Sequence, residues 1–295
     1  MPDSPNALKA WVLASRPKTL IAGISPVAIA VSLAATIQSI EWDFALFCLL
    51  FSLSIQIGAN FANDYFDYIK GADASDRIGP PRAAQSGWIS LPSLKKGIFF
   101  SFGAATMISL PLLARGGIWG SSLVALAILF AILYTGGPKP LGYLGLGEVL
   151  VFFFYGPIAT LGTYYILTLQ IDPLILYASL PPGLLSCAIL IANNLRDEHS
   201  DRRANKKTLI VRYGRTFGQW EYACTIALAA FIPLSAAAIG AAPFKWAFCS
   251  LILFAAYPAL KRAFTAQNPQ ELALLLPASA KLLYLYTVLF CIANG

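Results

Sequence analysis

The sequence predicts an all-α polytopic membrane protein with about nine transmembrane helices, and two observations support this class. Of the 295 residues, 58% are hydrophobic and only 12% are charged, whereas a soluble domain carries about 25% charged residues. The hydrophobic residues also form continuous runs of about the 20 residues that a helix needs to cross a bilayer. Because these runs show no alternation of apolar and polar residues, they predict helices rather than barrel strands.

Nine hydrophobic runs are predicted to span the membrane, although the third and the eighth are short. We expect the first run to remain as a span, because it is too long for the hydrophobic core of a cleaved signal peptide. The runs are residues 19–40, 44–63, 97–114, 118–136, 149–169, 173–193, 220–240, 244–260 and 272–292.

The basic residues are unevenly distributed over the connections between the runs. If the N-terminus lies inside the cell, 18 of the 21 basic residues fall on that side. The other side holds Arg115 and Lys245, and Lys281 falls within the last run. The basic side is then cytoplasmic by the positive-inside rule. Topology therefore explains the net charge of +7, and we expect no nucleic-acid partner.

Two polar segments, residues 60–77 and 193–203, each begin at the predicted cytoplasmic end of a hydrophobic run. Asn63 and Asp67 are four residues apart in the first segment, and Asn193 and Asp197 repeat this spacing 130 residues later. On a helix, a step of four residues turns the side chain by only about 40° and rises about 6 Å. Each pair therefore forms a stripe on one helix face.

The matching positions of these stripes suggest two quasi-repeated halves, about residues 19–136 and 149–292, in a single domain of residues 1–295. Asp201 extends the second stripe by one more step of four, whereas the corresponding place in the first is Gly71. We expect the two stripes to face a shared cavity.

The two polar segments contain half of the acidic residues of the chain, together with many basic ones. Clustered carboxylates repel one another unless cations lie between them, and Mg²⁺ commonly joins carboxylates to substrate phosphates. Basic side chains suit a multiply charged phosphate anion. A diphosphate attached to a hydrocarbon chain is therefore the predicted ligand. The carboxylates are Asp64, Asp67, Asp73, Asp76, Asp197, Glu198 and Asp201. The basic residues in these segments or shortly after them are Lys70, Arg77, Arg82, Arg196, Arg202, Arg203, Lys206 and Lys207.

Other interpretations of these segments stay open. Asp76, Glu198 and Arg203 fit solvated surface ion pairs equally well, and His199 is more typical of a loop residue than of a ligand. An ion-coupled membrane transporter could also have two repeated halves. Transporter sites usually lie near the bilayer midplane, whereas these carboxylates gather at one face.

Motifs of the same two segments resemble the UbiA superfamily of intramembrane prenyltransferases, and most closely its 1,4-dihydroxy-2-naphthoate polyprenyltransferases of menaquinone synthesis. The chain departs from the commonest first motif at Gly71, where a third Asp is usual, and the next carboxylate is Asp73. In the second motif, Asn205 stands four residues after Asp201. The first motif is residues 63–73 with 76–82, the second is residues 193–197, 201–202 and 206–209, and weaker matches are residues 16–20, 134–138 and 145–148.

The resemblance implies a nine-helix bundle around a central cavity, with both motifs at its cytoplasmic mouth in a bacterial inner membrane. It also implies Mg²⁺-dependent transfer of a polyprenyl group from its diphosphate to 1,4-dihydroxy-2-naphthoate, with loss of diphosphate and carbon dioxide, to form demethylmenaquinone. 4-Hydroxybenzoate or a naphthoate isomer remains possible as the aromatic acceptor.

Roles for individual residues follow from the stripes and from this resemblance. The expected metal ligands are Asn63, Asp67, Asp73, Asn193, Asp197 and Asp201, of which Asp67, Asp197 and Asp201 are also the expected catalytic residues. The expected diphosphate ligands are Lys70, Arg82, Arg196 and Lys207. The expected residues of the acceptor and prenyl cavity are Asn60, Tyr65, Tyr68, Tyr134 and Lys281.

Overall fold

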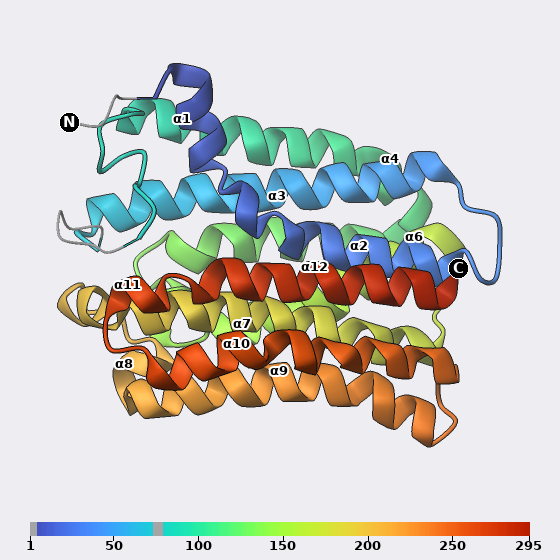
Figure 1. Ribbon diagram of the computed structural model, residues 1–295. Helices are drawn as coiled ribbons and strands as arrows, with labels where there is room; N and C mark the ends of the chain where they lie inside the picture. Colours follow the sequence, from blue (N-terminus) through green and yellow to red (C-terminus); the bar gives the residue numbers. More distant parts are fainter. Residues whose placement is uncertain (1–4, 73–78) are drawn as a thin grey trace.

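The computed structural model describes residues 5–72 and 79–295, and every regular element in these ranges is helical. The long helices run side by side along one direction and form a bundle (Figure 1). The elements are α1 (Ala7–Ala14), η1 (Pro17–Thr19), α2 (Ile21–Ala34), α3 (Trp42–Ile69), α4 (Leu91–Thr135), η2 (Leu141–Leu144), α5 (Gly147–Phe153), η3 (Phe154–Ile158), α6 (Ala159–Thr168), α7 (Pro173–Arg203), α8 (Leu209–Tyr213), α9 (Arg215–Ala238), η4 (Phe244–Leu251), α10 (Ile252–Thr265), α11 (Pro269–Leu272) and α12 (Leu275–Asn294).

The described residues contain seven helical stretches that are long and apolar enough to cross a membrane. A bent pair, Ala7–Thr19 with Ile21–Ala34, adds an eighth if it counts as one span, and its two parts meet at 54°. The predicted number of nine spans is therefore not confirmed. The seven stretches are Trp42–Ile69, Leu91–Thr135, Gly147–Thr168, Pro173–Arg203, Arg215–Ala238, Phe244–Thr265 and Pro269–Asn294.

The difference from nine arises in α4, which contains both the third and the fourth predicted runs. Gly117, inside α4, has a φ of 57°, a value that glycine adopts without steric cost. A β-carbon on Gly120 would lie 3.3 Å from the carbonyl oxygen of Leu112, although eight residues of straight helix separate two positions by about 12 Å. The chain therefore turns back on itself at Gly117, and α4 is one helical element with two arms.

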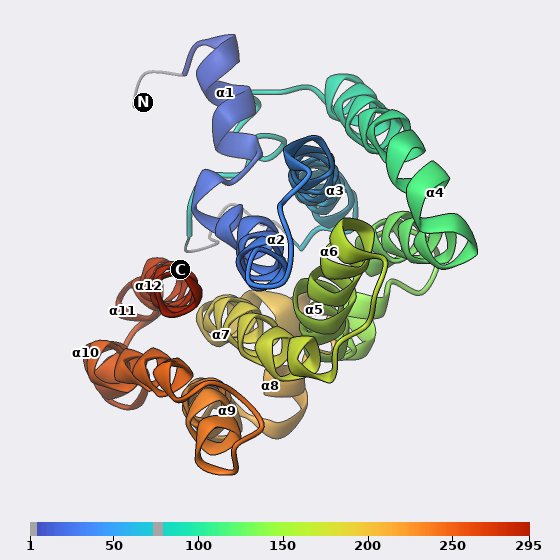
Figure 2. The same ribbon diagram turned by 90° about the vertical axis from the view of Figure 1, so that its right-hand side faces the viewer.

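Helix α7 lies in the interior of the bundle, between α2, α5 and α9 (Figure 2). Most of the apolar stretch of α7 is buried inside the protein, whereas little of the apolar stretch of α4 is buried. Large apolar side chains such as Phe100, Trp119 and Phe254 are exposed on the outer helices. An outward-facing apolar surface is stable in hydrocarbon and costly in water. The protein is an integral membrane protein.

Helices α3 and α7 both end on the same side of the bundle, and the C-terminus lies on the opposite side (Figure 1). We call this side the mouth and define it by residues 63–70 and 193–207. The second arm of α4 also ends here, because the Lys70 Nζ donates a hydrogen bond of 2.9 Å to the carbonyl oxygen of Thr135. The fold thus brings both motifs and the connection after α4 to one end.

Candidate active site

A cavity of about 250 Å³ lies between α2, α3, α4, η3, α6 and α7. Asn63 of α3 and Asn193 of α7 both line it. The first residue of each stripe therefore faces the same space, although the two are 130 residues apart in the chain.

The cavity is polar at the mouth and apolar at depth. Along α3 its lining runs from Asn63 to Cys48, a distance of about 22 Å for fifteen helical residues. Val27, Leu112 and Ile166 also line it and pack around Cys48. This gradient matches a ligand with a charged head and a hydrocarbon tail.

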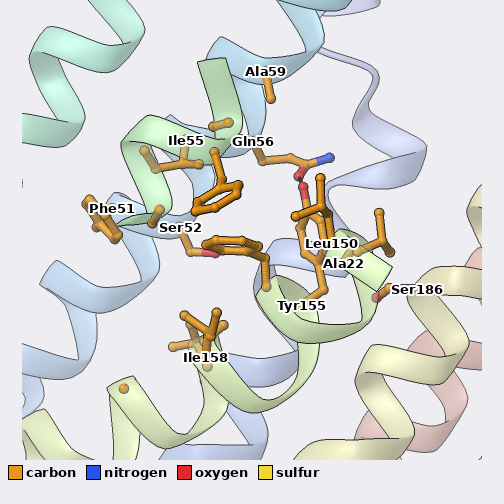
Figure 3. A pocket seen from close by; sticks show the side chains of 18 of the residues that line it. Ala22, Phe51, Ser52, Ile55, Gln56, Ala59, Leu150, Tyr155, Ile158 and Ser186 are labelled. Carbon is orange, nitrogen blue, oxygen red and sulfur yellow. Dashed lines mark hydrogen bonds between the residues drawn. The ribbon is translucent and has the colours of Figure 1, made fainter. Parts of the chain in front are cut away.

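The middle of the cavity is lined by aromatic and aliphatic side chains with a few polar groups between them (Figure 3). Phe51 and Ile55 of α3 and Ile158 of η3 lie around it, and the Tyr155 hydroxyl donates a hydrogen bond to Oε1 of Gln56. A polar group inside an apolar wall can orient a ligand, because it offers a hydrogen bond that the rest of the wall lacks.

The carboxylates of the first motif accept hydrogen bonds from neutral donors. Asp64, which is 1% exposed, accepts from the backbone N–H groups of Ala83 and Ala84 at 2.9 and 3.2 Å. Asp67, which is 4% exposed, accepts from the Tyr143 hydroxyl at 2.8 Å. Asp64 therefore anchors the segment before α4. Its role in the structure was missed from the sequence, because a carboxylate and the backbone that it binds share no sequence pattern.

Lys70, a predicted diphosphate ligand, lies just beyond the end of α3 at the mouth. Besides its bond to Thr135, its Nζ lies 4.8 Å from the ring centroid of Tyr143 and 5.6 Å from that of Phe66. Burial lowers the pKa of the Lys70 ammonium, and the Asp67 carboxylate opposes this shift.

The carboxylates of the second motif are paired with cations. Arg196 donates from Nε and Nη2 to the two oxygens of Asp197 at 2.7 and 2.6 Å. The Lys206 Nζ lies 3.6 Å from Oδ1 of Asp201. Arg196 was predicted to bind diphosphate, and the structure places its buried guanidinium on the carboxylate of Asp197.

The connection between α4 and α5 contributes two residues that the sequence analysis did not single out. Tyr143 of η2 contacts Asp67, and its carbonyl oxygen accepts a hydrogen bond of 2.9 Å from the backbone N–H of Lys207. The buried Glu148 of α5 accepts from Nδ2 of Asn194 at 2.9 Å. The available signal was that Tyr143 lies between, and Glu148 within, the two weaker family matches, residues 134–138 and 145–148.

The other predicted residues are divided between the cavity and its surroundings. Asn60 and Tyr134 line the cavity. Tyr65, Tyr68 and Lys281 are not among its lining residues. Tyr65 packs edge-on against Phe66 with ring centroids 5.1 Å apart, Tyr68 is 42% exposed, and Lys281 is exposed on α12. Arg82 is placed at the mouth by its neighbour Ala83, and Lys207 is exposed there. Asp73 lies outside the described residues.

The donor set at the mouth fits a hard divalent cation. In residues 5–72 and 79–295, no three His, Cys, Asp or Glu side chains form a metal-binding group by themselves. Two buried oxygens, Oδ1 of Asn63 and Oδ2 of Asp201, have no hydrogen-bond partner within the part of the chain that the structure describes. Such atoms are costly without a partner, and amide and carboxylate oxygens are the ligands that Mg²⁺ prefers.

The described helices form a membrane bundle with an apolar cavity, and carboxylates and basic groups lie at its mouth. These features define a class of membrane protein that binds amphiphilic anions. The model of the UbiA prenyltransferase family matches residues 24–283, and the chain belongs to this family.

Similar proteins support this assignment. A 1,4-dihydroxy-2-naphthoate octaprenyltransferase of Mycobacterium tuberculosis is 42% identical over 204 residues, which cover 69% of this chain and 70% of that protein. The protein of the same name from Haemophilus influenzae is 36% identical and covers 96% of this chain and 94% of its own length. A UbiA homologue from Archaeoglobus fulgidus, solved with DMAPP and Mg²⁺, shares the fold with a TM-score of 0.66 at 12% identity, over 95% of this chain and 98% of that one.

Proposed function

We propose that this protein transfers a polyprenyl group from its diphosphate to 1,4-dihydroxy-2-naphthoate, releasing diphosphate and carbon dioxide and forming demethylmenaquinol, the reduced form of demethylmenaquinone. The observation that carries this proposal is the meeting of Asn63 and Asn193, with the carboxylates beside them, at the mouth of an apolar cavity. The names of relatives 36 to 42% identical to the chain supply the acceptor. The single domain of residues 1–295, in its two quasi-repeated halves, carries the activity.

The mouth would hold the diphosphate through oxygen ligands and cations. Asn63, Asp67, Asn193, Asp197 and Asp201 offer oxygens for Mg²⁺, which when bound supplies positive charge against the leaving diphosphate. Asp73 completes the proposed ligand set from outside the described residues. The basic side chains of the mouth assist by neutralising the same charge.

The cavity below the mouth protects the reacting carbon from water. Breaking an allylic C–O bond leaves a cation that water would capture, and an apolar intramembrane wall excludes water. Tyr134 and Phe154, which line the cavity, present aromatic faces that attract a cation. The electron-rich ring of the acceptor then attacks the cation, and loss of carbon dioxide restores its aromaticity.

We further propose that the mouth faces the cytoplasm, as the 18 basic residues on that side indicate. Single cysteines placed at exposed Lys207 or His199 should react with a membrane-impermeant reagent in inverted vesicles and resist it in intact cells. Reaction in intact cells would reverse the orientation.

The test of function is product formation by the purified chain. The protein should be incubated with Mg²⁺, prenyl diphosphates of several lengths, and 1,4-dihydroxy-2-naphthoate, 4-hydroxybenzoate or another naphthoate isomer. Mass spectrometry should find a prenylated, decarboxylated product with 1,4-dihydroxy-2-naphthoate. Preference for another acceptor would reassign the substrate. Ion flux in liposomes without any product would favour a transporter.

A further inference from the structure

Tyr143 lies where the two motifs meet. It belongs to η2, the short helix Leu141–Leu144 between α4 and α5, and is 8% exposed. Its hydroxyl donates to Oδ1 of Asp67 at 2.8 Å. A hydrogen bond from a buried phenol restricts the rotation of a carboxylate, since one oxygen must keep facing the donor.

The Tyr143 ring is also within reach of two ammonium groups, one from each motif. The Nζ atoms of Lys70 and Lys206 lie 4.8 and 5.4 Å from its centroid. Both distances fall within the range in which an aromatic face attracts a cation. The Nζ of Lys206 also lies 3.6 Å from Oδ1 of Asp201, so the ring connects the lysine partner of Asp201 with Lys70 of the first motif.

The backbone around Tyr143 is fastened to the segment after α7. The Lys207 N–H donates a hydrogen bond to the Tyr143 carbonyl oxygen. Arg212 makes two more, from Nη2 to the carbonyl oxygen of Leu144 at 2.7 Å and from Nε to the carbonyl oxygen of Lys207 at 3.1 Å. Gly145 has a φ of 73°, and a β-carbon there would lie 2.8 Å from the Lys207 carbonyl oxygen. The position of η2 across the mouth is therefore closely defined.

We propose that Tyr143 is a positioning residue that couples the two motifs. Its hydroxyl holds the Asp67 carboxylate in one orientation, and its ring holds the ammonium groups of Lys70 and Lys206 so that both act on the same diphosphate. This inference rests on the proposed function, because it assigns Tyr143 a part in binding the diphosphate and its metal.

Two substitutions separate the hydroxyl from the ring. Tyr143→Phe removes only the hydrogen bond to Asp67, so the Mg²⁺ concentration for half-maximal activity should rise several-fold while the KM for prenyl diphosphate stays close to that of the wild type. Tyr143→Leu also removes the ring. The KM for prenyl diphosphate should then rise about tenfold, as expected for two cation–π contacts.

A binding measurement without turnover gives an independent readout. Thermal stabilisation of the purified full-length chain by Mg²⁺ with inorganic pyrophosphate should require about tenfold more pyrophosphate in Tyr143→Leu than in the wild type. Tyr222→Phe is the matched control, since it removes another buried tyrosine hydrogen bond, to Ser279 at 2.8 Å, from a position between α9 and α12.

A purely structural role for Tyr143 predicts a different result. Tyr143→Phe and Tyr143→Leu would then resemble Tyr222→Phe, with lower thermal stability but unchanged Mg²⁺, pyrophosphate and KM values, and this result would overturn the proposal. If Tyr143→Leu does not fold, Tyr143→Phe and Lys206→Gln provide the test. Unchanged Mg²⁺, pyrophosphate and KM values in both of these variants would overturn the proposal. A wild-type chain that neither binds pyrophosphate nor forms product would instead refute the proposed function.

Discussion

The two motifs have the same Asn and Asp spacing, but the structure holds their carboxylates in different ways. On α3, Asp64 and Asp67 accept hydrogen bonds from backbone N–H groups and from the Tyr143 hydroxyl. On α7, Asp197 is held by two bonds from Arg196, and Asp201 lies beside Lys206. The hydrogen bonds described for the first motif come from neutral donors, while the charges of Arg16 and Lys70 act on Asp64 and Asp67 from nearby. In the second motif, cations themselves pair with the carboxylates.

This difference separates two ways of presenting a carboxylate to a ligand. A neutral donor orients a carboxylate and leaves its negative charge available, whereas a bidentate guanidinium orients it and also neutralises it. We therefore expect the first motif to depend more on bound metal, and the second to combine metal binding with charge that the chain already carries.

Replacing the central carboxylate of either motif should have the largest effect. Asp67→Ala and Asp197→Ala should each lower prenyl transfer by about a thousandfold or more, because each removes an oxygen ligand from the charge that stabilises the leaving diphosphate. The measurement is product formation by purified protein of normal helix content. Asp43→Asn, at the opposite end of α3, is the control and should remain active. Full activity in either alanine variant would remove that motif from the site.

Asp197→Asn should destabilise the protein more than Asp67→Asn. It leaves the buried Arg196 guanidinium without its charged partner, and breaking a buried ion pair from one side costs about 3 kcal/mol or more. In Asp67→Asn, the neutral Tyr143 hydroxyl keeps an acceptor, because the new amide oxygen can still accept its hydrogen bond. Thermal unfolding of both variants in the same detergent would measure the difference. Equal unfolding midpoints would mean that the partners of Asp67 and Asp197 contribute equally to stability, which would contradict the comparison.

Asp64→Ala should reduce stability more than catalysis. It leaves the N–H groups of Ala83 and Ala84 without an acceptor, at a cost of about 1 to 3 kcal/mol. Prenyl transfer should remain measurable below the unfolding temperature, and Asp64→Asn, which keeps one acceptor oxygen, should lose less stability. Loss of transfer in a stably folded Asp64→Asn would place Asp64 among the metal ligands.

The smallest expected effect concerns pH and Lys70. Burial lowers the pKa of this ammonium below its usual value of 10.5, so its positive charge is lost at a lower pH than in a free lysine. The kcat/KM for prenyl diphosphate should therefore fall on the alkaline side before pH 10.5. In Lys70→Arg the fall should move to higher pH, since arginine stays charged. An unchanged alkaline limb in this variant would exclude Lys70 as its source.

Several features of the site could be predicted because they depend on local helix geometry. A step of four residues places two side chains on one face whatever surrounds the helix. The first residue of each pair, Asn63 or Asn193, lines the cavity, whereas Asp67, Asp197 and Asp201 are not among its lining residues. Asn60, one turn before Asn63, lines it for the same reason.

Features that depend on the rotation and packing of helices could not be predicted. Tyr65 and Tyr68 are an exception, because positions two and five residues after Asn63 lie about 160° and 140° around the helix from it. Helical periodicity alone was enough to exclude them from the cavity lining. Lys281 belongs to α12, whose orientation is set by its contacts with α2 and α7. The break between residues 97–114 and 118–136 was visible in the hydrophobic pattern, whereas the backbone angle at Gly117 that joins the two arms into one element was not.

Hydrophobic length and helical periodicity are local properties. They were therefore enough to predict a membrane-embedded helical bundle with two Asn and Asp stripes at one of its ends. Only the tertiary structure decided what each carboxylate contacts. Arg196 and Lys206 lie close in sequence to Asp197 and Asp201. Tyr143 and the backbone of Ala83 reach Asp67 and Asp64 through packing between distant segments, and such packing depends on the whole chain.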